Sequence, residues 1–208
     1  MLTTAQTAAF LITALLLTAT PGPDNLMVLS MGVSRGKKAG IAFGLGCALG
    51  CLSHTLLAVV GVGALVAASP MAFGLLKAAG GAYLVWLGLQ AIRHAGASPA
   101  GAQQDSHESL RRVFAKGLVA NAINPKVVLF FLSFLPQFVE PDAGHVTWQL
   151  GALGALFTAQ AAVLFGLLGF FSGSVGGWLN RQPAAGRWLD RLAGVIFIAL
   201  GLRMLTSR

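Results

Sequence analysis

The chain consists mostly of apolar runs that are about as long as a membrane is thick. Six of them lie at about residues 7–31, 41–67, 71–91, 114–138, 147–172 and 189–206, and a helix needs about 20 residues to cross a bilayer. Only 10% of the 208 residues are charged, which is too few to cover a water-soluble domain. In lipid, only helices or closed barrels satisfy the backbone, and these runs do not alternate as barrel strands do. The sequence therefore predicts an all-α integral membrane protein with six transmembrane helices.

The first apolar run is predicted to stay in the protein rather than to be cleaved as a signal peptide. Residues 1–6 contain no Lys or Arg, whereas a signal peptide starts with a positively charged segment.

The formal charge of +8 is distributed as a topology signal rather than as a nucleic-acid surface. Basic residues gather in alternate loops, where they are Arg35, Lys37, Lys38, Arg93, Arg111, Arg112, Lys116, Arg181, Arg187 and Arg191. The opposite side holds Lys77, Arg203 and Arg208. By the positive-inside rule the basic loops are cytoplasmic, so both termini are expected outside.

A hydrophilic segment, residues 94–113, divides this single membrane domain into two halves. We interpret it as a cytoplasmic linker between residues 1–93 and 114–208. Each half has three predicted helices, so the second half enters the membrane inverted relative to the first. The titratable residues of the linker, His94, Asp105, His107 and Glu108, are expected to be solvated. No metal site and no cofactor are predicted.

The first helix of each half is interrupted by a polar motif that contains proline. The motifs are TPGPDN at 20–25 and NAINPK at 121–126. Proline removes a backbone donor and clashes with the preceding turn, so each helix should unwind there. Matching breaks in two inverted halves indicate a transporter binding site near the middle of the membrane.

The predicted substrate-binding residues all lie in these two motifs. They are Pro21, Gly22, Pro23, Asp24, Asn25, Asn121, Asn124, Pro125 and Lys126. Asp24 either caps the second half-helix, accepting the amides of Leu26 or Met27, or takes part in the site as a ligand of an ammonium group or as a proton carrier. Lys126 pairs with Asp24, binds a substrate carboxylate, or extends to the membrane interface.

Three further polar residues in the predicted helices are weaker candidates. His54 either relays protons, as Asp24 could, or is a buried hydrogen-bonding residue. Thr158 and Gln160 are candidates of the same kind.

Two groups of small residues have packing as their simplest interpretation. Gly36, Gly40 and Gly44, then Gly46 and Gly50, then Gly169, Gly173 and Gly177 recur at spacings of four. Such ladders let helices approach closely inside one subunit, with a homodimer seam as the alternative.

Cys47 and Cys51 share one helix face, where a disulfide is geometrically poor. A membrane thiol-redox protein using these cysteines, or a passive channel, stays as an alternative function.

Several motifs together resemble the LysE/RhtB family of amino-acid exporters. They are TPGPDN at 20–25, SRGKKAG at 34–40 with Gly44, Gly46, Gly50 and His54, AGGAYLVWLGL at 79–89, and Asn124-Pro125-Lys126 followed by Phe130-Phe131 and LPQF at 135–138. The resemblance covers nearly the whole chain except the linker.

This resemblance implies a secondary active exporter of amino acids or close derivatives in the inner membrane, coupled to protons and working by alternating access. Such a protein is not an enzyme. Cys51 stands where some relatives carry an acidic residue, so we expect a neutral amino acid rather than a cationic one as substrate.

Overall fold

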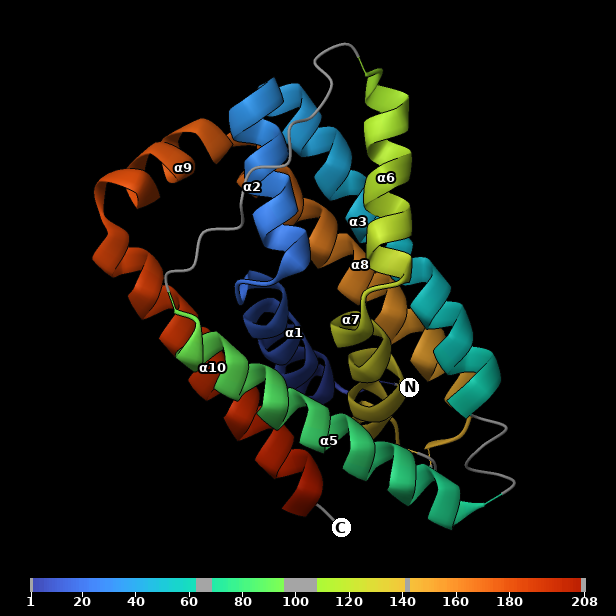
Figure 1. The fold of residues 1–208 in the computed structure, drawn as a ribbon. Coiled ribbons are helices and arrows are strands. Elements are labelled where there is room, and N and C mark those ends of the chain that lie inside the picture. The colour runs from blue at the N-terminus through green and yellow to red at the C-terminus, as the bar shows by residue number, and fades with distance from the viewer. Residues whose placement is uncertain (1, 63–68, 96–107, 141–142, 207–208) are drawn as a thin grey trace.

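The structure, a computed structural model, describes residues 2–62, 69–95, 108–140 and 143–206, which form helices and no strands (Figure 1). The first half contains α1 (Thr4–Ala19), α2 (Pro23–Arg35), α3 (Lys37–Leu57), the π-helical continuation η1 (Ala58–Val62) and α5 (Pro70–Arg93). The second half contains α6 (Leu110–Ala122), α7 (Pro125–Leu129), the π-helix η2 (Phe130–Phe134), the 3-10 helix η3 (Leu135–Phe138), α8 (Val146–Phe170), α9 (Ser172–Arg181) and α10 (Pro183–Thr206).

Up to five membrane-spanning segments are recognisable by length and hydropathy in the described part of the chain. Three are continuous, at Lys37–Gly61, Gly74–Arg93 and Val146–Phe170. Two more arise if each bent pair, α1 with α2 and α6 through η3, counts as one span. The predicted run at 189–206 lies in α10, where Asp190, Arg191 and Arg203 interrupt the apolar sequence. The all-helical fold class is confirmed, and the count of six spans stays a prediction.

Both predicted interruptions are present, and both bend the chain sharply. The axes of α1 and α2 meet at 56°, and those of Leu110–Ala122 and Pro125–Phe138 meet at 50°. Pro23 is the first residue of α2 and Pro125 the first residue of α7, where a missing backbone donor costs nothing. The two breaks lie next to each other in the middle of the molecule (Figure 1).

The helices form two groups. In the larger group α3 packs along α6 and α8, with α1 and α2 against α8 and α3. In the other, α5 and α10 pack along each other at the edge of the molecule (Figure 1). Gly88 and Gly194 make this pairing close, because a Cβ added to either would lie 2.5 Å from the carbonyl oxygen of the other.

The glycine ladders mostly pack inside the subunit. A Cβ on Gly40 would meet Gly32 and Gly169, and one on Gly46 would meet the carbonyl of Phe114. Gly36 instead joins α2 to α3 with a φ of 85°, a conformation that favours glycine. Gly173 and Gly177 face open space, so a dimer seam there is untested.

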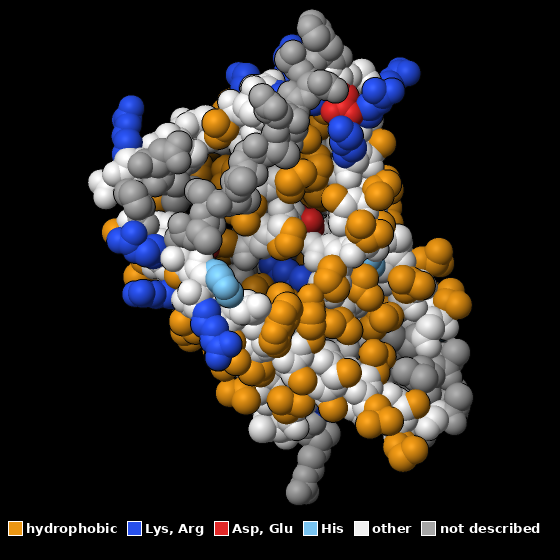
Figure 2. All heavy atoms as spheres, in the orientation of Figure 1, with side chains coloured by type: hydrophobic (Ala, Val, Ile, Leu, Met, Phe, Trp, Pro, Cys, Tyr) orange, Lys and Arg blue, Asp and Glu red, His pale blue; other side chains and the backbone are white. Residues whose placement is uncertain are grey.

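The molecular surface is largely hydrophobic, with Lys and Arg gathered toward one side (Figure 2). We call the region around Arg35, Lys37, Arg111, Arg112 and Lys116, at the ends of α2, α3 and α6, the basic end. The opposite end holds the start of α1 and the end of α10 (Figure 1).

The predicted linker ends earlier than expected, and Glu108 within it is not solvated. Helix α6 begins at Leu110, with the Ser109 side chain as its cap. The Glu108 side chain is only 6% exposed, and it lies 3.1 Å from Arg35 of α2 and 2.8 Å from Lys116 of α6. The prediction was wrong because the partner in α2, Arg35, is 73 residues away in the sequence, so no local pattern indicated that it would cover Glu108. Asp105 and His107 lie outside the described residues.

Glu108 is the centre of an ion cluster that joins α2 to α6 at the basic end. Arg35 also donates to its backbone carbonyl, at 2.6 Å. The hydrogen bond from Lys116 is the main cause that holds the pKa of the Glu108 carboxyl below its usual range, and the charges of Lys116, Arg35 and Arg112 act in the same direction.

Candidate functional site

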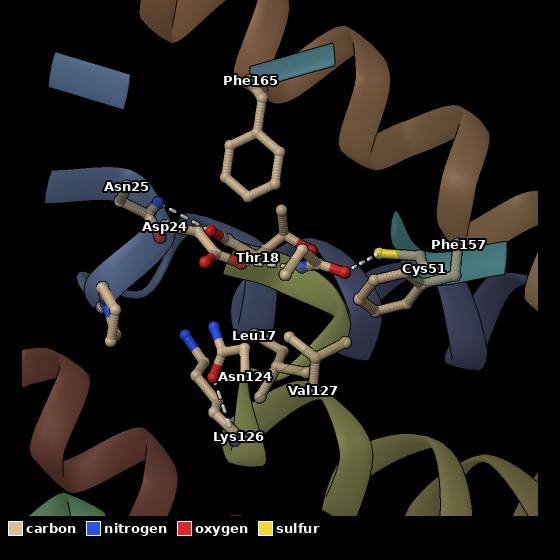
Figure 3. Close-up of a pocket in the computed structure, with 13 residues that line it drawn as sticks. Leu17, Thr18, Asp24, Asn25, Cys51, Asn124, Lys126, Val127, Phe157 and Phe165 are labelled. Atoms are coloured by element: carbon tan, nitrogen blue, oxygen red, sulfur yellow. Dashed lines mark hydrogen bonds between the residues drawn. The ribbon is translucent and has the colours of Figure 1, made fainter. Parts of the chain in front are cut away.

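A small pocket lies where the two helix breaks meet. It is lined by Leu17, Thr18, Gly22, Pro23, Asp24, Asn25, Cys51, Asn121, Asn124, Lys126, Val127, Phe157 and Phe165. Seven of the nine predicted site residues are among them, and Pro21 and Pro125 are not. Figure 3 shows Asp24 and Asn25 on one side, Lys126 and Asn124 on another, and the rings of Phe157 and Phe165 opposite them. The breaks therefore bring the two motifs together, as predicted.

The pocket is contracted in this conformation. It leaves only about 20 Å³ for the centres of water molecules, which is room for roughly one or two waters. An amino acid does not fit without movement of the helices.

The end of α1 is held by side chains from both breaks. The amide of Asn25 donates to the carbonyl oxygen of Thr18 at 2.8 Å, and the Lys126 ammonium donates to that of Thr20 at 3.1 Å. These are the carbonyls that a broken helix leaves without partners. Lys126 thus points into the protein, 7% exposed, rather than to the membrane interface.

The two half-helices that follow the breaks begin differently. Asn124 precedes α7, and its side chain accepts the amide of Lys126 at 3.1 Å. Gly22 precedes α2 and has no side chain to do the same. The first amides of α2 therefore have no side-chain cap, and the helix dipole at this end attracts negative charge.

Asp24 does not cap α2, which corrects one of its two predicted roles. It is the second residue of its helix, as Lys126 is of α7. Its carboxylate accepts the amide of Asn121 at 2.7 Å. Asp24 and Lys126 line one pocket, yet in the described part of the chain they form no ion pair, since each is bound to other groups.

Asn121 also connects the pocket to His54. The His54 Nε2 atom lies 3.0 Å from the Asn121 backbone carbonyl. A carbonyl oxygen only accepts, so Nε2 carries the hydrogen. The Nδ1 atom is buried without a partner among the described residues. His54 and Asp24 are therefore both bonded to Asn121, one through its backbone and the other through its side chain.

The cysteines are buried and not bonded to each other. Cys51 lines the pocket, and its thiol lies 3.5 Å from the Asn121 side-chain oxygen. Cys47 lies one turn away in the core and is fully buried.

The pocket also contains residues that the sequence did not indicate. Leu17, Thr18, Val127, Phe157 and Phe165 resemble any other core residue in sequence, so no pattern could have identified them. Gln160, a weak candidate, donates to the Thr18 hydroxyl at 2.8 Å. Its own oxygen and the Thr158 hydroxyl are buried without partners in the described part of the protein.

The pocket lies below a hollow on one face of the molecule. Figure 2 shows one acidic and one basic side chain recessed between α2 and α6, the helices that lead to the basic end. Asp24 and Lys126 are each 7% exposed.

The groups in the pocket suit a small zwitterion better than a metal ion. The carboxylate of Asp24 matches an ammonium group, while the Lys126 ammonium and the first amides of α2 match a carboxylate. The described residues contain no group of three or more His, Cys, Asp or Glu side chains able to hold a metal.

Comparisons with known proteins give a consistent result. The family described as LysE type translocator matches residues 15–208. An uncharacterized membrane protein of Vibrio cholerae is 34% identical, over 96% of each chain. The homoserine/homoserine lactone efflux protein of Salmonella typhimurium is 29% identical, also over 96% of each chain. The leucine efflux protein of Salmonella choleraesuis is 25% identical, over 95% of this chain and 93% of the relative. No solved structure gives a significant match.

Proposed function

We propose that this chain, which belongs to the LysE type translocator family, exports amino acids or close derivatives and binds them where its two broken helices meet. It is a membrane transport protein and not an enzyme. Relatives named for homoserine and leucine efflux support this substrate class. The observation that carries the proposal is the presence of Asp24, Lys126 and the uncapped start of α2 in one pocket.

The zwitterion is held by groups of opposite charge. Its carboxylate takes the amides at the start of α2 together with the Lys126 ammonium, and its ammonium takes Asp24. The pocket contains one acidic and one basic side chain, so a neutral amino acid leaves no charge unmatched. A cationic side chain would find no second carboxylate among the lining residues, because Cys51 and Asn121 are neutral.

Export proceeds by alternating access of two inverted halves, each with three spans in the inner membrane and its basic loops in the cytoplasm. The close pairing of equivalent helices, α3 with α8 and α5 with α10, supports this arrangement. The contracted pocket supports a cycle in which helices must move before substrate enters. The bends of 56° and 50° supply points where such movement is possible.

Protons drive the cycle through Asp24. When Asp24 is protonated it no longer holds the substrate ammonium, so the substrate leaves. Asn121 links Asp24 to His54, whose Nδ1 has no described partner and can accept a proton. We propose Asp24 as the group that carries the proton and His54 as a second proton acceptor close to it, with Asn121 positioning both side chains.

The experiment is efflux by cells that overexpress the protein, screened on toxic amino acids and analogues. For any substrate found, Asp24→Asn should abolish export and its dependence on a pH gradient. The variant can keep the hydrogen bond to Asn121, so it should fold. Asp190→Asn, a carboxylate change in α10 outside the pocket, is the matched control and should export normally. Wild-type export by Asp24→Asn would remove Asp24 from the mechanism.

Two alternative functions are separated by simple measurements. A passive channel shows no exchange of labelled substrate in vesicle counterflow and no response to a pH gradient. A thiol-redox protein loses its activity when Cys47 and Cys51 are both replaced by Ala, whereas an exporter keeps transport.

A further inference from the structure

A second, much larger cavity lies at the end of the molecule opposite the basic end. It leaves about 920 Å³ for the centres of water molecules, a size typical of binding sites for small molecules. It is open on one side and is lined by the start of α1, the first half of α5, the end of η2, η3 and the end of α10. Its walls carry Gln6, Lys77, Gln137, Glu140 and Arg203, so charges of both signs face a space large enough for a hydrated zwitterion.

A continuous column of phenylalanine rings separates this cavity from the small pocket. Phe157 lines the pocket, and its ring centroid is 5.2 Å from that of Phe130. Phe130 is 5.3 Å from Phe134, which is 5.4 Å from Phe138. Phe134 and Phe138 line the large cavity, and Phe10 of α1 packs edge-on against Phe138. The column therefore joins the two cavities ring by ring.

The column is dry and tightly packed. Phe10 and Phe130 are 0% exposed, and Phe134 is 1% exposed. Apolar rings in contact leave no room for water or for a charged solute, so the column seals the pocket from the large cavity in this conformation.

The segment that carries the column is not a regular helix. Phe130–Phe134 form a π-helix and Leu135–Phe138 a 3-10 helix, directly after the five-residue α7 that follows the break. Such segments are uncommon and frequently lie at functional sites. A change in the bend at Pro125 would therefore move these rings together.

We propose that the large cavity is the outer vestibule of the export route and that the phenylalanine column is the gate that closes the pocket from it. The inference rests on the proposed function for its direction, since substrate must leave on the side opposite the basic end. Opening requires η2 and η3 to shift, which parts Phe130 from Phe157 and Phe138 from Phe10.

The chain contains its own reporters for this gate. Cys51 lines the pocket, while Cys47 lies in the core and does not line it, and the two are 1% and 0% exposed. Phe134→Ala removes the ring that lies between Phe130 and Phe138, and so interrupts the column. A membrane-impermeant maleimide added outside intact cells should then label Cys51 and leave Cys47 unlabelled. Cys47→Ala and Cys51→Ala versions of the variant identify the labelled thiol.

Phe170→Ala is the matched control, because Phe170 is a half-exposed phenylalanine of α8 outside the column. It should leave both cysteines as unreactive as in the parent protein. If Phe134→Ala unfolds, Cys47 is labelled as well, and Phe134→Val, which still removes the ring but leaves a smaller void, replaces it. Cys51 unlabelled in a folded Phe134 variant, or labelled equally in Phe170→Ala, would overturn the gate. Neither result depends on export, so failure of the proposed function is seen separately, as absence of efflux by the parent protein.

Discussion

At the scale of single residues, the two charged side chains of the pocket are hydrogen-bonded to uncharged groups and not to each other. Asp24 and Lys126 hold equivalent positions at the starts of α2 and α7, yet each is bound to an uncharged group, Asn121 or Thr20. A direct ion pair would have to be broken before either could bind substrate. Partners of this kind can be exchanged for the charged ends of a zwitterion at lower cost.

The ion cluster at the basic end gives a prediction about pH. The pKa of Glu108 is lowered in the folded protein, chiefly by the hydrogen bond from Lys116. A lowered pKa stabilises the fold above the pKa of the unfolded state, about 4.3 for Glu, and this contribution is lost as pH falls through the folded value. Thermal unfolding in detergent should therefore lose stability in acid more steeply for the parent than for Glu108→Gln.

Glu140→Gln, which changes an exposed carboxylate, is the control for this measurement. It should follow the parent curve between neutral pH and about pH 3. Parallel curves for all three proteins would show that the cluster does not contribute to stability.

At the scale of elements, the close approaches of helices at glycine give a second prediction. A Cβ on Gly117 of α6 would meet the carbonyl of Phe43 in α3, whereas one on Gly166 of α8 meets nothing within 4 Å. Gly117→Ala should lower the unfolding free energy by about 1–3 kcal/mol, the usual cost of overpacking. Gly166→Ala should change it by less, or raise it, because alanine favours a helix. Equal effects in the two variants would mean that the α3–α6 contact does not limit packing.

The sequence predicted the positions of the helices and of their two breaks well. Proline has a local effect on the backbone, so the breaks at Pro23 and Pro125 could be located from the chain alone. Apolar runs located the helices to within a few residues in most cases. The contact of the two breaks could be predicted because both carry the same kind of motif, whereas the contact of Arg35 with Glu108 has no such signal, which is why Glu108 was interpreted as a solvated residue. The phenylalanine column was missed for the same reason, since its rings come from α1, η2, η3 and α8.

At the scale of the whole molecule, the remaining question is whether α10 crosses the membrane. Its apolar stretch between Arg191 and Arg203 is 11 residues long, shorter than the roughly 20 that a span needs. Against this, α10 packs along α5, which does qualify as a span. The two backbones lie close together over two turns of each helix, at the pairs Gly88–Gly194 and Gly81–Gly201.

We expect α10 to span the membrane, because a helix fixed along a spanning neighbour cannot lie on the surface. Helix α10 has 24 residues and is about 36 Å long, of which the segment from Arg187 to Arg203 takes about 24 Å. That segment is a few Å shorter than the hydrocarbon core, and the long side chains of both arginines extend to water at the two interfaces. A C-terminal fusion should then be active with alkaline phosphatase, which works only outside, and dark with green fluorescent protein. A fusion after residue 95 should behave in the opposite way. A fluorescent C-terminal fusion would leave five spans, place the two ends of the chain on different sides, and contradict the proposed inverted halves and the alternating access proposed from them.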